Sequence, residues 1–198
     1  MGKIKFFIDN GEYWKCENLT KEYNRMGKAM VKAAQNYLAK HKKNASGRLS
    51  RSIGYEFNVK DNSLFVQHTF DGVDYWAFVE HGVQGAIDSS KAPESPFKFG
   101  TKTGRPGGLR AGIDRWVILK KLPGFRDAKG RFVPRKNQVR AIARKIYLYG
   151  ISPTPFSSTS IETVYDQYKD RLETAWNLDV EAYFDKKVKD EIIIKIQF

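Results

Sequence analysis

Apolar residues recur along residues 18–43 at steps of three and four, the spacing that brings side chains to one face of a helix. Asn18 or Thr20 is expected to cap the start of this helix, and the cations around His41 suit the negative end of its dipole. The pattern predicts a long N-terminal helix that packs across a sheet or against a neighbouring subunit. Its apolar seam consists of Leu19, Tyr23, Met26, Met30, Ala33 and Tyr37.

Alternation of apolar and polar residues predicts short strands at four places. The two middle strands flank Asp61-Asn62 and should form a hairpin. The first strand is followed by the turn signal Asn10-Gly11, after which residues 12–17 could supply a second hairpin strand. The four predicted strands cover residues 3–9, 55–59, 64–70 and 192–198.

Helical spacing returns in the second half of the chain. Gly82 and Gly150 are expected to end two of these helices, because glycine readily adopts the left-handed conformation of many helix C-termini. The last helix continues to Val188 and can break near residues 177–179. Its apolar face is expected at Ile161, Tyr165, Tyr168, Leu172 and Trp176. The predicted helices of this half cover residues 75–82, 109–117, 136–149 and 157–188.

Residues 75–82 are the most apolar point in the middle of this polar chain. Helical spacing predicts that one face of the segment is buried in the core and that its exit lies at the edge of that core. A long loop is expected to depart from this exit toward another subunit. The face comprises Tyr75, Phe78, Val79 and Gly82, and the exit comprises Glu80, His81 and Gly82.

Two long basic loops complete the organisation. Residues 83–108 are rich in Gly and Pro, and residues 122–136 can form a small hairpin. A loop as long as the first is usually functional or disordered. A chain of 198 residues suits a single domain, here expected over residues 1–198. The sequence predicts an α+β fold, with a small antiparallel sheet packed against the long N-terminal helix and the C-terminal helices.

The charge of the chain is unevenly distributed. The formal net charge is +13, and residues 91–150 hold 16 Lys and Arg against 3 Asp and Glu, so the rest of the chain is neutral overall. This segment predicts a localised positive surface whose partner is nucleic acid or an acidic protein, unless the charges only solvate the protein. The arginines expected to contact partners or DNA are Arg105, Arg110, Arg115, Arg126, Arg131, Arg135, Arg140 and Arg144.

Other features exclude whole classes of protein. The single cysteine, Cys16, excludes an internal disulfide and a cysteine metal cage. No apolar run approaches the roughly 20 residues of a membrane helix, and the N-terminus lacks a signal-peptide pattern. We therefore expect a protein without membrane contact that is made and assembled in a reducing cytoplasm.

Motifs of catalysis are weak. No nucleotide-binding loop is present, and the three histidines fall in different predicted elements. Asp71, Asp74 and Glu80 cluster as in a metal-dependent nuclease, but a turn at Asp71-Gly72 and a helix cap by Asp74 explain them better. We predict no catalytic residue, no metal and no cofactor, and expect that the protein is not an enzyme. Any DNA contact would be to phosphates, because the sequence has no base-reading motif.

Three motifs occur in the order found in one family of virion proteins. The first is Ser46-Gly-Arg-Leu-Ser-Arg-Ser-Ile53, after the long helix and before the hairpin. The second is residues 75–82, and the third begins at Ile142 and ends in Pro153-Thr-Pro-Phe156. Over residues 18–176 the chain resembles bacteriophage tail-completion or head–tail joining (neck) proteins. The long loops and the terminal strands depart from that pattern.

The resemblance implies a non-enzymatic ring subunit of a tailed bacteriophage. Such proteins sit in the neck between the portal-side connector and the tail tube, or cap the tube. The resemblance favours a hexamer, with a dodecamer possible, and implies contacts with portal or connector proteins, with tail-tube proteins and with DNA in the channel. The protein would be located in the virion and assembled in the host bacterial cytoplasm. The alternative is a basic DNA-binding or DNA-packaging-associated protein.

Overall fold

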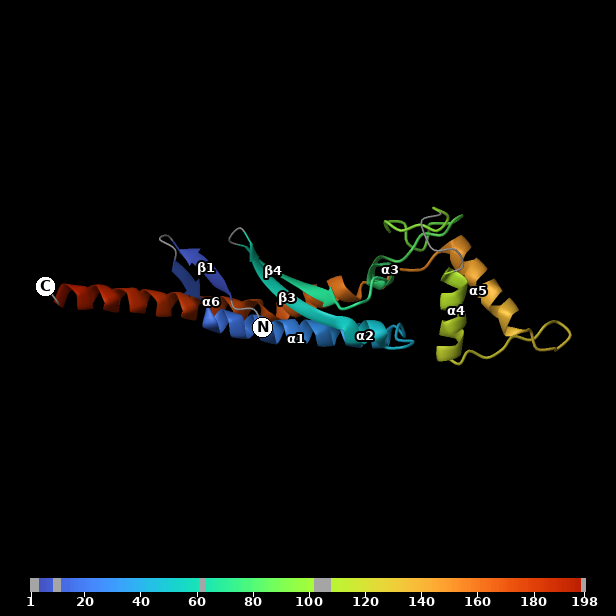
Figure 1. Cartoon of the computed structure of the whole chain (residues 1–198), viewed down its shortest axis with the longest axis horizontal. Helices are drawn as coiled ribbons and strands as arrows, with labels where there is room; N and C mark the ends of the chain where they lie inside the picture. Colours follow the sequence, from blue (N-terminus) through green and yellow to red (C-terminus); the bar gives the residue numbers. More distant parts are fainter. Residues whose placement is uncertain (1–3, 9–11, 61–62, 102–107, 197–198) are drawn as a thin grey trace. The chain divides into compact units, whose positions relative to one another are not determined.

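The computed structural model describes residues 4–8, 12–60, 63–101 and 108–196. Its helices and strands are drawn in Figure 1. In chain order they are β1 (Lys5–Ile8), β2 (Glu12–Lys15), α1 (Glu17–Lys40), α2 (Arg48–Ser52), β3 (Ile53–Lys60), β4 (Ser63–Phe70), α3 (Trp76–His81), α4 (Gly108–Leu119), α5 (Arg135–Tyr149) and α6 (Phe156–Ile196).

The chain divides into two compact units. Unit 1 comprises the described residues of Met1–Asn36, Ile53–Asp71 and Ser157–Phe198, and unit 2 those of Tyr37–Ser52 and Gly72–Phe156. Unit 1 therefore holds both hairpins, most of α1 and nearly all of α6, whereas unit 2 holds α2 to α5 and the long loops. The single domain expected over residues 1–198 stays a prediction.

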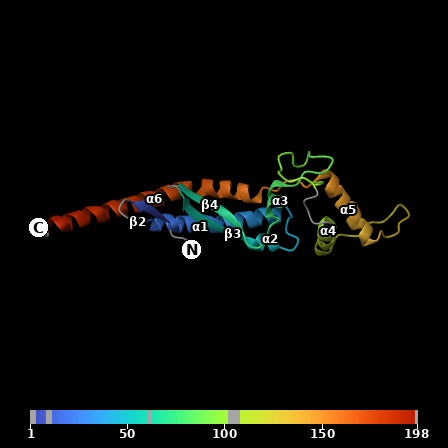
Figure 2. The same ribbon diagram turned by 45° about the horizontal axis from the view of Figure 1, so that its top comes forward.

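Two antiparallel hairpins form the sheets of unit 1. β1 pairs with β2, and β3 pairs with β4 in a register that places Tyr55 opposite His68 and Phe57 opposite Val66. Both predicted hairpins are confirmed, although their turn residues, 9–11 and 61–62, lie outside the described residues. In Figures 1 and 2 the β3–β4 hairpin lies against α1 and α6, which confirms the predicted α+β class.

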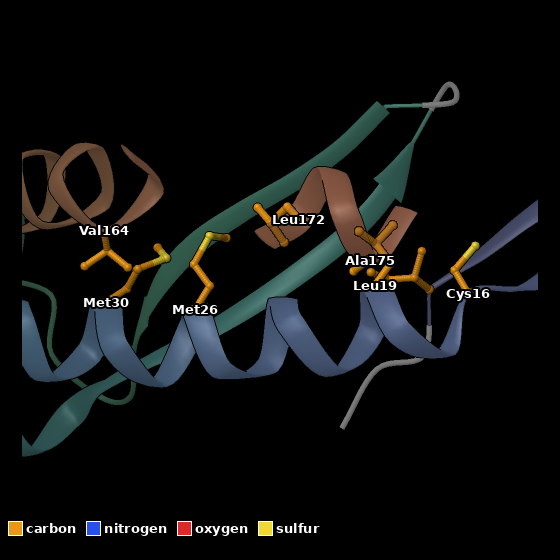
Figure 3. Close-up of a cluster of buried hydrophobic side chains, with 8 residues drawn as sticks. Cys16, Leu19, Met26, Met30, Val164, Leu172 and Ala175 are labelled. Carbon is orange, nitrogen blue, oxygen red and sulfur yellow. The ribbon is translucent and has the colours of Figure 1, made fainter. Parts of the chain in front are cut away.

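The core of unit 1 lies between α1, α6 and the β3–β4 hairpin. Figure 3 shows Leu19, Met26 and Met30 of α1 facing the α6 side chains. Partly buried side chains of the hairpin, including Phe57 and Val66, pack against the same cluster. The α6 members are Val164, Leu172 and Ala175. Burial of apolar surface at about 25 cal/mol per Å² makes this cluster the main stabilising feature of the unit.

A glycine inside α1 lets the hairpin come close. A Cβ atom on Gly27 would lie 2.1 Å from the Tyr55 ring, and the Tyr55 hydroxyl donates a hydrogen bond to the Asn24 side chain at 3.1 Å. Glycine in a helix interior costs about 1 kcal/mol relative to alanine. That cost is offset here by the packing of an aromatic ring directly on the helix backbone.

The start of α1 is capped from the other end of the chain. The Asp179 carboxylate accepts hydrogen bonds from the backbone N–H groups of Asn18 at 3.0 Å and Leu19 at 2.8 Å, and from the Asn18 side-chain amide at 3.0 Å. The predicted caps, Asn18 and Thr20, are therefore wrong. The Thr20 hydroxyl instead donates to the Cys16 carbonyl. Burial, with Asp179 nearby, raises the pKa of the Cys16 thiol to about 12.

α6 runs without interruption from Phe156 to Ile196, so the predicted break near residues 177–179 is wrong. Residues 192–196 belong to this helix, so the strand predicted at 192–198 is wrong for them. Residues 197–198 lie outside the described residues. Once a helix has formed, each further residue adds one hydrogen bond for one residue fixed, and β-branched residues lower helix propensity only slightly. Asp179, which suggested a break, faces α1 instead.

The buried faces differ in part from the predicted ones. The α1 seam is confirmed at Leu19, Met26 and Met30, and Tyr23 and Ala33 pack partly buried against the same core. Towards the end of the helix the buried side chains are Ala34 and Leu38. On α6 the predicted core residues Tyr165 and Trp176 are 50% and 37% exposed. The buried α6 side chains are Phe156, Ser160, Val164, Leu172, Ala175 and Asp179.

In unit 2 the ends of α3 and α5 lie side by side. Gly82 and Gly150, with φ angles of 71° and 73°, follow these helices as predicted. Val83 and Ile151 then pair as an antiparallel bridge, with N–O distances of 2.9 and 2.8 Å. A Cβ atom on Gly150 would lie 2.2 Å from the Val83 carbonyl oxygen. Only glycine satisfies both the backbone conformation and the close approach.

Asp179→Ala is expected to lower the free energy of unfolding by about 2 kcal/mol, because it removes the charged acceptor of the α1 N-terminus. Chemical denaturation measures the change. Glu181→Ala, an exposed α6 position, is the matched control and should change it by less than about 0.5 kcal/mol. Equal effects of the two substitutions would show that the cap contributes nothing.

Gly150→Ala is expected to destabilise unit 2 by about 2 kcal/mol, because the new methyl group meets the Val83 carbonyl in a strained backbone conformation. Gly112→Ala is the control: Gly112 lies in α4 with no atom within 4 Å of an added Cβ, so the change should be neutral or stabilising by up to about 1 kcal/mol. Thermal denaturation compares the two. A Gly150→Ala protein as stable as the wild type would contradict the close approach.

Candidate interaction surface

Residues 108–149 of the basic segment form α4, α5 and the loop between them. α4 and α5 pack against each other in unit 2 (Figure 1). Val117 of α4 and Val139 and Ala143 of α5 are buried. The cations of both helices stay exposed, so the packing of this pair determines where the positive charge lies.

An open pocket of about 630 Å³ lies at this pair of helices. Its charged lining consists of Arg110, Asp114, Arg135, Lys136 and Arg140. Asp114 forms an ion pair with Arg135, with an Oδ1–Nε distance of 3.0 Å. The lining therefore holds one carboxylate and four cations. The excess positive charge makes the pocket suitable for an anionic group, such as a carboxylate or a phosphate.

One side of α5 carries a row of exposed cations at four-residue steps: Lys136, Arg140 and Arg144. α5 contains no acidic residue, and none of the three cations forms an ion pair with a described residue. Like charges at this spacing destabilise a helix by about 0.2–0.5 kcal/mol per pair. An acidic partner would relieve that repulsion.

The loop between α4 and α5 forms a small hairpin, as predicted. Arg126 and Phe132 form an isolated antiparallel bridge, and the Arg126 guanidinium lies 3.9 Å from the centre of the Phe132 ring. Asp127 accepts from the backbone N–H groups of Arg131 and Lys129 and pairs with the Arg131 side chain at 2.9 Å. These hydrogen bonds lower the pKa of Asp127 below its ordinary value, and the bond from the Arg131 backbone N–H has the largest effect. Two of the predicted partner arginines therefore shape their own loop.

The predicted partner residues fall into three groups. Arg110, Arg135 and Arg140 meet at the pocket, and Arg126 and Arg131 lie in the hairpin loop. Arg115 and Arg144 are exposed and do not line the pocket. Arg105 lies outside the described residues. The role of these arginines in contacting partners stays a prediction.

The apolar face predicted for residues 75–82 is buried only in part, with Val79 half-buried. Tyr75 and Phe78 are 40% and 43% exposed, and the buried residues are Glu80, at 5% exposure, and Gly82. A helix of six residues is too short to bury a whole face, and Phe78 finds only partial cover from Phe97, with 4.5 Å between ring centres. Of the three residues predicted to lie where the loop leaves the core, Glu80 and Gly82 are buried and His81 is exposed.

The loop that follows α3 first turns back to α5 of its own unit. The Ala86 N–H donates to the Tyr147 carbonyl at 2.8 Å, and Phe99 pairs with Gln84 at 3.0 Å. The first contact joins residues about 60 positions apart, so no local sequence signal marks it. Residues 102–107 of the loop lie outside the described residues.

Exposed apolar side chains also lie within the basic segment. They follow one another through the end of α4 and the hairpin loop: Trp116, Ile118, Leu119, Phe125 and Phe132, at 37% to 67% exposure. Aromatic residues and arginine together are characteristic of the centres of protein–protein interfaces. Sequence reasoning found the arginines from their charge but missed this run of exposed apolar neighbours.

The titratable residues considered for catalysis do not come together. Asp71 and Asp74 are exposed, whereas Glu80 is buried, and α3 begins without a side-chain cap, so the predicted cap by Asp74 is wrong. His68 lies in unit 1, where its Nδ1 atom is 2.8 Å from the Ser157 hydroxyl oxygen. Among the described residues, no group of three or more His, Cys, Asp and Glu side chains could hold a metal ion.

No helix in the described part of the chain has the length and apolar character to cross a membrane.

Comparison with known proteins identifies one related family. Residues 17–82 match the model of a family described as "Bacteriophage HK97-gp10, putative tail-component". No curated protein and no solved structure matches the chain. The matched segment runs from α1 to the end of α3 and includes two of the three motifs on which the resemblance to phage neck proteins rests. Over residues 17–82 the chain is therefore similar to HK97-gp10-like bacteriophage tail components.

Proposed function

We propose that this chain is a structural, non-enzymatic subunit of a tailed-bacteriophage virion that forms a ring in the neck and joins the head to the tail. The observation that carries the proposal is the match of residues 17–82 to a phage tail component. A subunit of this kind stabilises the virion through contacts repeated around a ring, so it needs interaction surfaces rather than a catalytic centre.

The exposed apolar side chains support assembly. Single exposed apolar residues are normal, but unit 2 presents five on consecutive segments beside its arginines. In unit 1, α6 continues beyond Asp179, the residue that caps the start of α1, and leaves Phe184 and Val188 60% and 54% exposed. A helix that presents apolar side chains at four-residue spacing is suited to pack against another protein.

The proposed partners follow from the neck position. The ring would contact a portal or connector protein on one side and a tail-tube protein on the other, with a hexamer favoured over a dodecamer. The protein would be assembled in the host cytoplasm and remain in the virion. DNA in the channel could contact the basic surface through its phosphates.

A second function is favoured by one observation, the concentration of the whole net charge of +13 in residues 91–150. A DNA-binding or DNA-packaging protein would use such a segment to neutralise phosphates. Its affinity for DNA would fall steeply with salt, because each phosphate contact releases a counterion.

The purified chain is expected to form closed rings with a single subunit number. Light scattering gives the particle mass, and negative-stain electron microscopy shows whether the particles are closed. DNA affinity measured across a series of salt concentrations tests the second function. A chain that stays monomeric or dimeric and binds DNA with a steep salt dependence would reject the ring and favour DNA binding.

A further inference from the structure

The exposed side of α6 carries a row of carboxylates. Glu162, Asp166, Asp170 and Glu173 follow at steps of four, four and three, which at about 100° per residue places them on one side of the helix. All four are exposed, and the buried residues Val164, Leu172 and Ala175 lie on the opposite side. None of the four forms an ion pair with a described residue.

This acidic row and the cationic row of α5 match in spacing. Lys136, Arg140 and Arg144 repeat every four residues, as do the first three carboxylates, so each row rises about 6 Å per charge. The α5 row places like charges one turn apart, which destabilises its own helix. In the α6 row the exposed Lys169 lies among the carboxylates and offsets part of their repulsion. One helix–helix contact would bring three cations to three carboxylates and relieve the repulsion that remains in each row.

We propose that the α5 row of one copy of this chain docks on the α6 row of a neighbouring copy and forms the contact between subunits. The inference rests on the proposed ring function and identifies the surfaces that build the ring. The two surfaces differ, so the contact is head to tail, and head-to-tail contacts generate rings when their rotation closes.

The pocket beside α5 strengthens the contact. Lys136 and Arg140 line it together with Arg110, so a carboxylate that reaches Arg140 enters an open cavity with further cations around it. The one carboxylate already there, Asp114, is bonded to Arg135. An incoming carboxylate therefore meets uncompensated positive charge, and charge-assisted bonds to arginine are about twice as strong as neutral ones.

Aromatic side chains flank both rows. Tyr165 and Trp176 lie beside the α6 carboxylates at 50% and 37% exposure, and Tyr147 follows the α5 row at 42%. Complementary charge mainly selects the partner and speeds encounter, whereas buried aromatic area supplies much of the affinity. The combination fits a protein partner better than DNA, which would pair with the α5 row and be repelled by the α6 row.

Charge reversal tests the contact. Lys136→Glu/Arg140→Glu reverses the α5 row, and Asp166→Lys/Asp170→Lys reverses the α6 row. Each variant alone is expected to lose the ring and elute as a folded monomer, with subunit affinity lowered at least tenfold. The matched control is Lys28→Glu/Lys32→Glu, which reverses two exposed α1 cations at the same spacing and should leave the ring intact. Circular dichroism checks that every variant is folded.

Mixing the two variants provides the decisive measurement. Every contact between the two kinds of copy then joins opposite charges, so an equimolar mixture should restore rings in which the variants alternate and the subunit number is even. Rings that persist in either variant alone, or folded variants whose mixture stays monomeric, would overturn the inference. The same holds if Lys136→Glu/Arg140→Glu keeps the ring and loses only DNA affinity.

The outcome for the wild-type chain separates the two proposals. A wild-type chain that stays monomeric overturns the proposed ring, and this contact with it. A wild-type ring that forms equally well in the charge-reversal variants overturns the contact alone and leaves the ring function standing.

Discussion

Unit 2 depends on the close approach of two helix ends, at Gly82 and Gly150. Each glycine turns the chain with a positive φ, and the residues after them pair, so that a side chain at either position would strike the backbone of the other segment. This contact fixes the start of the long loop and the end of α5. The placement of the cationic row therefore rests on two residues that carry no charge and do not belong to the row.

Unit 1 depends on hydrogen bonds between backbone groups and a side chain far away in the sequence. The first N–H groups of α1 find their acceptor in Asp179, which lies on α6 about 160 residues away in sequence. The acceptor reaches them only because α6 continues through this position as a helix. The same continuity keeps Val164, Leu172 and Ala175 in register with α1 and turns the carboxylates of α6 outward. Core packing and surface charge are thus set by one uninterrupted helix.

Periodicity predicted the elements whose own residues carry a regular apolar pattern. The spacing of Leu19, Met26 and Met30 predicted α1, and alternation predicted the β3–β4 hairpin. The errors lie where a distant partner decides. Asp179 looks like a helix breaker until the α1 N-terminus is placed beside it, and Phe78 looks like a core residue until the short length of α3 limits what can cover it. The sequence likewise revealed the basic segment but not the pocket, which requires α4 and α5 to pack.

The net charge of each segment does not reveal the second charged surface, the acidic row of α6. Outside residues 91–150 acidic and basic residues balance, so the remainder of the chain appears neutral. In a helix, however, the position of a residue sets the side to which it points, and α6 places Glu162, Asp166 and Asp170 on one side. Of its two nearby cations, Arg171 pairs with Glu22 of α1, whereas Lys169 lies among the carboxylates. A chain that only binds DNA would gain nothing from a second, acidic row. Two rows of opposite sign and equal spacing favour recognition of the chain by another copy of itself.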